Sequence, residues 1–240
     1  MLTGPDLSGA PGPGTPLSKL PHFDPRTVPV SGIDAHLPAI EVQRLTQQAL
    51  RQRFAQPPEW TPHASTERPI SSRPLAHAAV LVPIVIRDRP MVILTERTTH
   101  LSTHSGQVAF PGGKRDESDT DAAHTALREA HEEIGLEQRF VEVIGQMPTY
   151  TTGSQFVITP VVALVRPEHA LQLNAYEVAD AFEVPLEFLM NPAHHHRHVF
   201  EWEGYRREWL SMPYRDGHSE RFIWGATAAM LRNLYRFLSA

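Results

Sequence analysis

The sequence predicts an α/β fold in which a mixed sheet lies between helices, and three observations lead to this prediction. Apolar runs at 78–86 and 156–165 have the length and the β-branched content of buried strands. Between them, residues 120–134 carry apolar side chains at helical spacing, and a second such stretch closes the chain at 226–238. Strands and helices in this order are expected to pack as an α/β/α sandwich.

The residues before this domain are predicted to be extensions of it. Residues 1–38 are rich in Pro and Gly, a composition typical of a flexible leader. Apolar residues then recur at helical spacing from Pro38 to Phe54, which predicts one amphipathic helix in the segment 39–75, followed by a Pro-rich connector. The main domain is expected to span residues 76–240. The leader and its helix could form a lid, an interface or a solubility tail, and the sequence leaves this open.

Within the main domain, Pro83 predicts that the strand at 78–86 is an edge strand or contains a bulge, because proline donates no ladder hydrogen bond. The helix at 120–134 is expected to end at Gly135, a favourable C-cap, with its alanine-rich side on the sheet. The other expected elements are strands at 91–95, 107–110 and 141–147, helices near Ala179 and Phe188, and a hairpin at 198–213.

Composition and charge exclude several classes of function. The net charge of -5 argues against a general nucleic-acid binder, which needs a basic surface. The absence of cysteine excludes disulfides, a thiolate nucleophile and a Cys-based zinc site. No stretch approaches the ~18 apolar residues of a membrane span, and the first residues lack the features of a signal peptide. We therefore expect a cytoplasmic protein that binds neither nucleic acid nor membrane, with a homodimer as one option for its assembly.

Three carboxylates share one side of the predicted helix at 120–134. Because a helix advances roughly 100° per residue, Glu133 lies roughly 40° to one side of Glu129 and Glu132 roughly 60° to the other. Such like charges repel each other unless a positive group lies between them. Mg²⁺ and Mn²⁺ prefer oxygen ligands and suit this cluster. The alternative is a solvated acidic face whose glutamates pair with nearby basic residues, which is common on helices.

The surrounding segment, GGKRDESDTDAAHTALREAHEEIGL at 112–136, resembles the Nudix box. That pattern is a Gly, five residues, a Glu, seven residues, and then Arg-Glu-hydrophobic-any-Glu-Glu-any-Gly-hydrophobic. The second half fits throughout, from Arg128 to Leu136. The first half departs from the pattern, since Asp119 stands in place of the Glu and eight residues separate it from Arg128. This variant is similar to the coenzyme A diphosphatase branch of the Nudix hydrolases.

The preceding segment is also similar to that branch, whose signature is Leu-Leu-Thr-any-Arg followed by Arg, Gly and Phe-Pro-Gly-Gly. Here Ile93 to Arg97 leads to Phe110-Pro111-Gly112-Gly113. Thr98 stands where Ser or Ala is usual, and Ser102 where Arg is usual, which puts a phosphate contact at that position in doubt. The resemblance covers residues 76–238 and implies a Nudix-type α/β/α sandwich with a mixed sheet.

The resemblance also implies roles for the box residues. Glu129, Glu132 and Glu133 are expected to hold Mg²⁺ or Mn²⁺, which in turn grips the diphosphate of the substrate. Arg128 is expected to pair with the box carboxylates and to fix their rotamers, without touching substrate. Gly112 and Gly113 let the backbone bend tightly and come close to the metal site, although an ordinary turn is the alternative.

The general base and the substrate contacts stay open. Glu129 is one candidate base, and a later acid, Glu177 or Glu183, is another; Glu177 could instead be an extra metal ligand or an ordinary acid at a helix start.

The candidate cations for the nucleotide phosphates are Arg97, Lys114 and Arg115. His100 and His104 could meet phosphate, although a surface histidine without such a role is commoner. The run of histidines at 194–198 is interpreted as a solvated loop and not as a metal site, because successive residues point in different directions.

These features support one leading hypothesis and two rivals. The resemblance implies metal-dependent hydrolysis of coenzyme A or acyl-CoA to adenosine 3′,5′-bisphosphate and (acyl-)4′-phosphopantetheine. One rival is a Nudix pyrophosphatase acting on ADP-ribose, NADH or another nucleoside diphosphate derivative, which would use the same metal chemistry. The other is a non-catalytic Nudix-like binding module, which would be expected to lack part of the carboxylate set. The choice between Mg²⁺ and Mn²⁺, and between free and acylated coenzyme A, is open.

Overall fold

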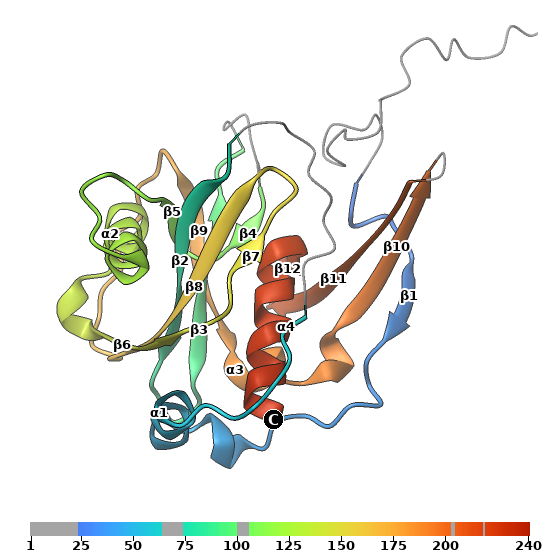
Figure 1. Ribbon diagram of the computed structural model, residues 1–240, viewed down its shortest axis with the longest axis horizontal. Coiled ribbons are helices and arrows are strands. Elements are labelled where there is room, and N and C mark those ends of the chain that lie inside the picture. Colours follow the sequence, from blue (N-terminus) through green and yellow to red (C-terminus); the bar gives the residue numbers. More distant parts are fainter. Residues whose placement is uncertain (1–23, 64–73, 100–105, 203–204, 218) are drawn as a thin grey trace, which may run out of the picture.

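The chain folds as two sheets with helices between and around them (Figure 1). The computed structural model describes residues 24–63, 74–99, 106–202, 205–217 and 219–240. Within these ranges, no helix has the length and apolar character needed to cross a membrane. The histidines at 100 and 104, Ser102 and the leader up to residue 23 lie outside the described residues.

The larger sheet is mixed and contains eight strands in all, two of which form its central pair. Strand β2 (Ala76–Val85) runs parallel to β8 (Phe156–Val165) over its whole length, and the other neighbouring strands are antiparallel. The main order is β4-β3-β2-β8-β6, with β5 beside β2, β7 beside β8 and β9 beside β3. The bounds of these strands are β3 Met91–Arg97, β4 Val108–Ala109, β5 Gly112–Lys114, β6 Val141–Gln146, β7 Tyr150–Thr151 and β9 Val178–Pro185.

Two predictions about this sheet are wrong. Pro83 lies in the central strand β2, opposite Ala163, and not at an edge or a bulge. The strand accepts a proline because, on the side away from β8, its pairing with β5 ends at Val80 and its pairing with β3 begins at Ile84. The helix expected near Ala179 is the strand β9, which pairs with β3 from Met91 to Arg97. Pairing with a neighbouring strand, and not a local pattern, decided its conformation.

The helix α2 (Ala122–Ile134) covers one face of the larger sheet, as the sequence predicts. Asp121 caps its first turn by accepting a hydrogen bond from the backbone of His124, and Gly135 ends it with φ 67°. The buried side of the helix includes Ala126, Ala130 and Ile134, which pack on sheet residues. Small alanines allow the helix to approach the sheet closely, and this brings the polar side of α2 beside β5.

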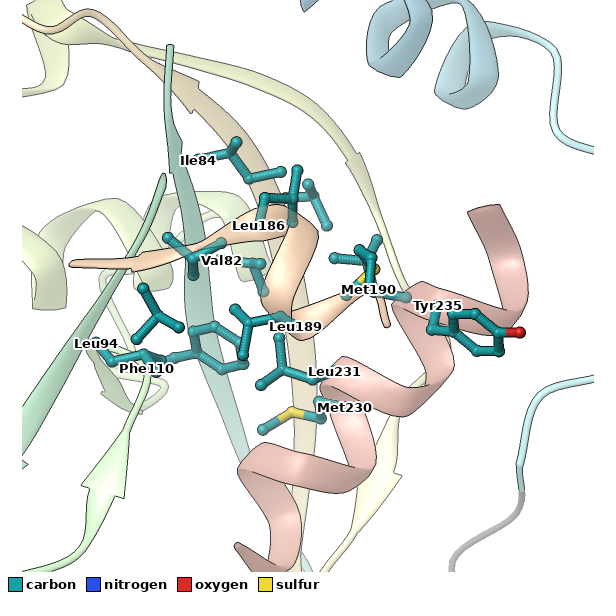
Figure 2. Packing of buried hydrophobic residues seen from close by; sticks show 14 of the residues in the cluster. Val82, Ile84, Leu94, Phe110, Leu186, Leu189, Met190, Met230, Leu231 and Tyr235 are labelled. Atoms are coloured by element: carbon teal, nitrogen blue, oxygen red, sulfur yellow. The ribbon is translucent and has the colours of Figure 1, made fainter. Parts of the chain in front are cut away.

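The opposite face of the sheet is covered by the C-terminal helix α4 (Gly225–Ser239), which lies between the two sheets (Figure 1). Its residues Met230 and Leu231 belong to the same buried core as Val82, Leu94 and side chains of the short helix α3, and Leu231 lies next to Leu189 (Figure 2). Helix α3 spans Leu186–Leu189, close to the helix expected near Phe188. Helices on both faces of the mixed sheet give the predicted α/β/α arrangement.

The smaller sheet is antiparallel, in the order β1-β10-β11-β12. It includes the hairpin predicted at 198–213 and adds a third strand after it. It also contains β1, which comes from within the predicted leader, so that part of the leader is ordered against β10. The strands span Val30–Ile33, His196–Trp202, Tyr205–Asp216 and Ser219–Trp224 for β1, β10, β11 and β12.

The helix predicted between Pro38 and Phe54 is interrupted. A 3₁₀ helix, η2 (Val42–Leu45), precedes α1 (Gln47–Ala55), because Thr46 has an extended backbone and caps α1 through a hydrogen bond from Ala49. Leu45 and Leu50 are buried in the main core. This segment is therefore part of the folded body. Two further 3₁₀ helices lie at Gln138–Phe140 (η3) and Pro192–His194 (η4).

The histidine run at 194–198 is not the solvated loop that the sequence predicts. His195 is fully buried, and its Nδ1 accepts a hydrogen bond from Arg232 at 2.9 Å while its Nε2 donates to the Leu189 carbonyl at 2.8 Å. Arg232 also forms an ion pair at 2.9 Å with the buried carboxylate of Asp34, which follows β1. The cluster ties the N-terminal segment to α4.

Acid should weaken this cluster. Burial is the main cause that lowers the pKa of His195 from 6.5 to about 4. Between these pH values the unfolded chain binds more protons at His195 than the folded chain does, so stability should fall as pH drops from 6.5 towards 4. Denaturant unfolding of the wild type and of His195→Gln across this window would test it. We expect a flatter pH dependence in the variant, and equal slopes would contradict the prediction.

Candidate active site

Strand β5, and not the tight turn that the sequence predicts at Gly112 and Gly113, brings a backbone donor onto one of the box glutamates. Strand β5 pairs with β2 and contacts α2, so that Gly112 and Gly113 lie over the side of the helix that carries Glu129 and Glu133. The amide of Gly112 donates a 3.0 Å hydrogen bond to Glu133 Oε2. Gly112 has φ 156°, and a Cβ there would lie 2.4 Å from the Ala79 carbonyl oxygen. Only glycine fits this position without moving backbone atoms.

Gly113 leaves room for the carboxylate of Glu129. A Cβ on Gly113 would lie 2.6 Å from the carboxylate carbon and from both oxygens of Glu129. Burial is the main cause that raises the pKa of Glu129, and the charges of Glu132 and Glu177 raise it further, while Arg128 lowers it. Glu129 is thus half-buried between like charges and one arginine.

Glu133 is the most deeply buried of the box glutamates, at 4% exposure. Burial raises its pKa to about 7, and the charges of Glu129 and Glu177 act in the same direction. Two groups lower the pKa of Glu133 and so oppose this shift. One is the Gly112 amide, through its hydrogen bond, and the other is Arg97, through its charge, with Nη1 3.7 Å from Glu133 Oε1. Arg97 thus reaches a carboxylate of the box and lies at the site.

Glu177 joins this group from a distant part of the chain. It lies in the turn before β9 and carries a charge that raises the pKa of both Glu129 and Glu133. Its Oε1 accepts a 3.4 Å hydrogen bond from Asn174 Nδ2. Glu183, the other loop acid considered, pairs with Arg87 at 2.8 Å on strand β9. The structure therefore favours Glu177 over Glu183 as the additional acid of the site.

Glu132 points away from this group. Its side chain is 55% exposed and accepts a 3.1 Å hydrogen bond from Arg128. The helix therefore places Glu132 and Glu133 on opposite sides of Glu129, in agreement with the helical spacing. Among the described residues, no three Asp, Glu or His side chains are already grouped at the spacing of a metal site.

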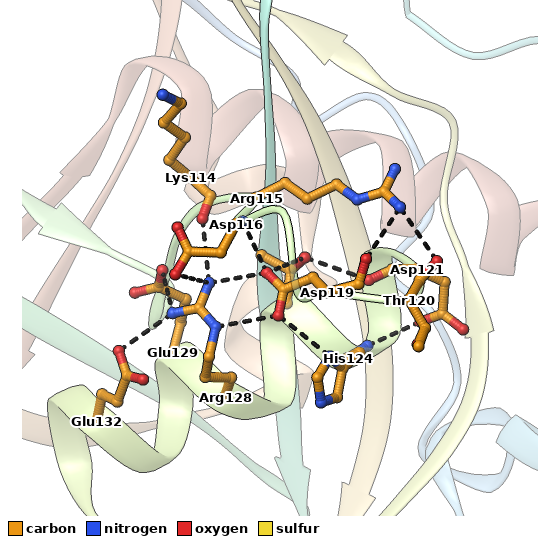
Figure 3. A network of polar contacts seen from close by, with 11 residues as sticks. Lys114, Arg115, Asp116, Asp119, Thr120, Asp121, His124, Arg128, Glu129 and Glu132 are labelled. Atoms are coloured by element: carbon orange, nitrogen blue, oxygen red, sulfur yellow. Dashed lines mark hydrogen bonds and ion pairs between the residues drawn. The ribbon is translucent and has the colours of Figure 1, made fainter.

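Arg128 is the centre of a polar network between α2 and the preceding loop (Figure 3). Its guanidinium donates two hydrogen bonds to Asp119, at 2.9 and 3.1 Å, one to Glu129 at 2.9 Å, and one to the Lys114 carbonyl. Asp119 is buried, and the hydrogen bond from Arg128 is the main cause that lowers its pKa well below the usual range. The network holds the loop on the helix.

Asp119 is a site residue whose role the sequence did not indicate. It stands where the box pattern has Glu, and it also accepts hydrogen bonds from the Thr125 hydroxyl and the Asp116 amide. A signal was present in the sequence, namely an acid nine residues before Arg128 in an acid-rich loop. The pairing itself becomes visible only when the loop folds back onto the helix.

Lys114 and Arg115 differ in their freedom to meet a ligand. The guanidinium of Arg115 donates hydrogen bonds to the carbonyls of Asp119 and Thr120 and so stabilises the loop. Lys114 is exposed and is the last residue of strand β5, next to Gly113. Both residues line a cavity of about 600 Å³ together with residues 74–77, Asp116 and Glu117. Of the two, Lys114 is the better placed to meet an anionic ligand.

The donor set of the site suits a hard divalent cation. Glu129, Glu133 and Glu177 offer only carboxylate oxygens, and their like charges raise the pKa of the buried members. The lack of a side chain at Gly113 leaves room for the Glu129 carboxylate. The ligand type of these residues therefore fits a divalent cation, although the three carboxylates are not yet grouped at metal-binding distances in this structure.

Adding a methyl group at Gly113 should separate activity from stability. In Gly113→Ala the new Cβ would push the flexible end of Glu129 aside, so we expect kcat to fall by about 10²-fold, as for a catalytic group misplaced by ~1 Å. Gly112→Ala would press on backbone instead and should lower the melting temperature. Steady-state kinetics and thermal unfolding of both variants would test this. Full activity in Gly113→Ala would contradict the prediction.

Comparisons with known proteins place this site in a family. The family model of the NUDIX domain matches residues 75–203. A Nudix hydrolase NudL of Yersinia enterocolitica, named as uncharacterized, is 42% identical over 159 residues, which cover 66% of this chain and 79% of that protein. The protein of the same name from an Enterobacter species is 39% identical over 171 residues, covering 70% of this chain and 86% of the relative.

A solved structure, a MutT/nudix family protein from Enterococcus faecalis, aligns with 81% of this chain and 75% of its own, at 13% identity and a TM-score of 0.43. The family match and the mixed sheet between helices confirm the predicted fold class. The matched residues include the box helix, Gly112 and Gly113 of strand β5, and Glu177. The chain belongs to the Nudix family and is a hydrolase of that family.

Proposed function

We propose that the protein hydrolyses the diphosphate linkage of coenzyme A or acyl-CoA, releasing adenosine 3′,5′-bisphosphate and (acyl-)4′-phosphopantetheine. The observation that carries the proposal is the position of the segment 93–113, which resembles the coenzyme A diphosphatase branch. Arg97 and Gly112 of this segment both reach the carboxylate of Glu133, at 3.7 and 3.0 Å. These two contacts between the segment and the box support the proposal.

In this proposal, Glu129, Glu132, Glu133 and Glu177 are the residues that would hold Mg²⁺ or Mn²⁺. Glu132 would have to turn away from Arg128 to take part, and its exposure leaves it free to do so. A bound cation would stabilise charge on the phosphoryl oxygens and lower the pKa of an attacking water. The acidic net charge of the chain makes such a cation favourable for the approach of an anionic diphosphate.

Side chains of the protein would accept the proton, position the carboxylates and bind the phosphates. Glu177 or Glu129 would accept the proton from the attacking water, because both are partly exposed carboxylates of the acidic group that includes Glu133. Arg128 would keep Glu129 in one rotamer by its 2.9 Å hydrogen bond. Arg97 and Lys114 would bind phosphate oxygens, Arg97 from the Glu133 side of the site and Lys114 from the cavity beside Gly113.

Product analysis with coenzyme A, ADP-ribose and NADH in parallel would test the proposal. We expect release of adenosine 3′,5′-bisphosphate from coenzyme A that needs Mg²⁺ or Mn²⁺ and is lost in Glu132→Gln. Faster cleavage of ADP-ribose or NADH would overturn the coenzyme A assignment and leave the hydrolase chemistry in place. The rates of cleavage of free coenzyme A, acetyl-CoA and a longer acyl-CoA would then show which form is the preferred substrate.

A further inference from the structure

Two consecutive residues at the end of β3 reach two glutamates from different elements. Arg97 ends the strand and approaches Glu133 on α2, at 3.7 Å. Thr98 follows, and its amide donates a 3.0 Å hydrogen bond to the carbonyl of Glu177. Its hydroxyl donates a second, also 3.0 Å long, to the carbonyl of Tyr176. Thr98 is only 6% exposed, so these two bonds are shielded from water.

Asn174 holds the same turn from the other side. Its amide donates to the carbonyl of Glu133, the penultimate residue of α2, at 2.9 Å. Its side-chain nitrogen donates to the carboxylate of Glu177 at 3.4 Å, and its side-chain oxygen accepts from the amide of Tyr176 at 3.2 Å. The backbone carbonyl of Asn174 accepts from Glu177 at 2.9 Å. The turn 174–177 is thereby joined to both α2 and β3.

This turn has to resist a repulsive force. The 2.9 Å bond from the Asn174 amide to the Glu133 carbonyl places this turn beside the box, and Glu177 and the box glutamates are carboxylates whose ionised forms repel each other. A loosely held turn would lower this repulsion by swinging Glu177 out into water. A carboxylate that is displaced by ~1 Å from its working position costs an enzyme about 10²-fold in rate. Hydrogen bonds to the backbone on both sides of Glu177 oppose this displacement.

We propose that Thr98 and Asn174 form a clamp that fixes the Glu177 carboxylate against the box glutamates, with both acting as positioning residues. The inference rests on the proposed function only in giving Glu177 a part in the chemistry. Thr98 is also a position where this chain departs from the Ser or Ala of the resembling branch. An alanine there would lack the hydroxyl that bonds to the Tyr176 carbonyl, whereas a serine would keep it.

A double-mutant cycle between Thr98→Val and Glu177→Gln would test the clamp. Valine keeps the shape of threonine and the backbone bond to Glu177 but removes the hydroxyl bond to Tyr176. We expect kcat to fall by about 10- to 100-fold in Thr98→Val, with KM close to the wild-type value. Because Thr98 would act through Glu177, the same change made in Glu177→Gln should cause little further loss. Thr98→Ser should restore most of the activity.

Thr227→Val is the matched control. Thr227 on α4 is equally buried, at 6% exposure, and its hydroxyl donates a 3.1 Å hydrogen bond to the carbonyl of Val108. This substitution removes the same kind of bond, so it should shift the melting temperature about as Thr98→Val does while kcat is retained. A fall in kcat confined to Thr98→Val would therefore reflect the position of Glu177 and not a general loss of stability.

The cycle uses whichever of coenzyme A, ADP-ribose and NADH the wild type cleaves fastest, so a wrong substrate assignment leaves the test intact. Losses that multiply in the double variant would overturn the proposal, as would an unchanged kcat in either single variant. Equal losses in Thr98→Val and Thr227→Val would overturn it as well. An Asn174→Ala variant with the same non-additivity towards Glu177→Gln would extend the support to the second half of the clamp.

Discussion

Glu133→Gln should lower kcat by about 10²- to 10⁴-fold while the fold is retained. A cation that stabilises a phosphoryl transition state supplies several kcal/mol, and each 1.36 kcal/mol corresponds to a tenfold change in rate. Glutamine keeps the size of the side chain and an oxygen that accepts the 3.0 Å hydrogen bond from Gly112, but removes the charge. Steady-state kinetics at saturating Mg²⁺ or Mn²⁺ would measure the loss, with circular dichroism as the test of folding.

Glu137→Gln is the matched control for this variant. Glu137 follows the same helix, is about half exposed, and pairs only with a surface arginine, Arg139, among the contacts described. Its neutralisation should leave kcat within twofold or so of the wild-type value, since exposed ion pairs contribute little. A Glu133→Gln variant that kept full activity would remove this residue from the proposed ligand set. The remaining carboxylates would then have to be re-examined one at a time.

Arg128→Met should destabilise the protein by about 3–5 kcal/mol, the usual cost of removing one partner from a buried ion pair. Asp119 is fully buried at its side chain, and Arg128 supplies two of its hydrogen bonds and its main neutralising charge. Methionine fills much of the same space but removes the guanidinium from the Asp119 carboxylate, which keeps only the imidazole of His124, at 3.1 Å, as a basic neighbour among the described residues. Urea unfolding at neutral pH would measure the change, with an unchanged slope as the sign that the unfolded state is the same.

The double variant Asp119→Asn/Arg128→Met should be more stable than Arg128→Met alone, because it removes the uncompensated charge as well. Arg206→Met serves as a control for the loss of an arginine, since Arg206 pairs with glutamates on the exposed surface of the small sheet. It should change the unfolding midpoint little. Equal midpoints for Arg128→Met and Arg206→Met would show that the Asp119 pair does not stabilise the loop.

The local elements were predictable because their signals lie within one turn or one strand of the chain. The helical period of apolar residues and the Gly135 cap gave α2 almost to the residue. The same spacing put Glu132 and Glu133 on opposite sides of Glu129, and the structure has this arrangement. The roles of these glutamates in metal binding stay predictions. Where local signals compete, as in β9 and the interrupted helix before Phe54, tertiary packing decided the outcome.

The sequence by itself determined the Nudix family and the face of the helix that carries the acids, because both depend on residue type and short-range spacing. Only the tertiary structure decided which distant groups meet that face. The charge of Glu177 raises the pKa of Glu129 and Glu133, Asp119 folds back onto Arg128, and Thr98 and Asn174 bond to the turn that carries Glu177. The position of each depends on how β3, β9 and α2 pack together. Contacts between residues far apart in the chain follow from the burial of a shared core, which no short-range pattern records.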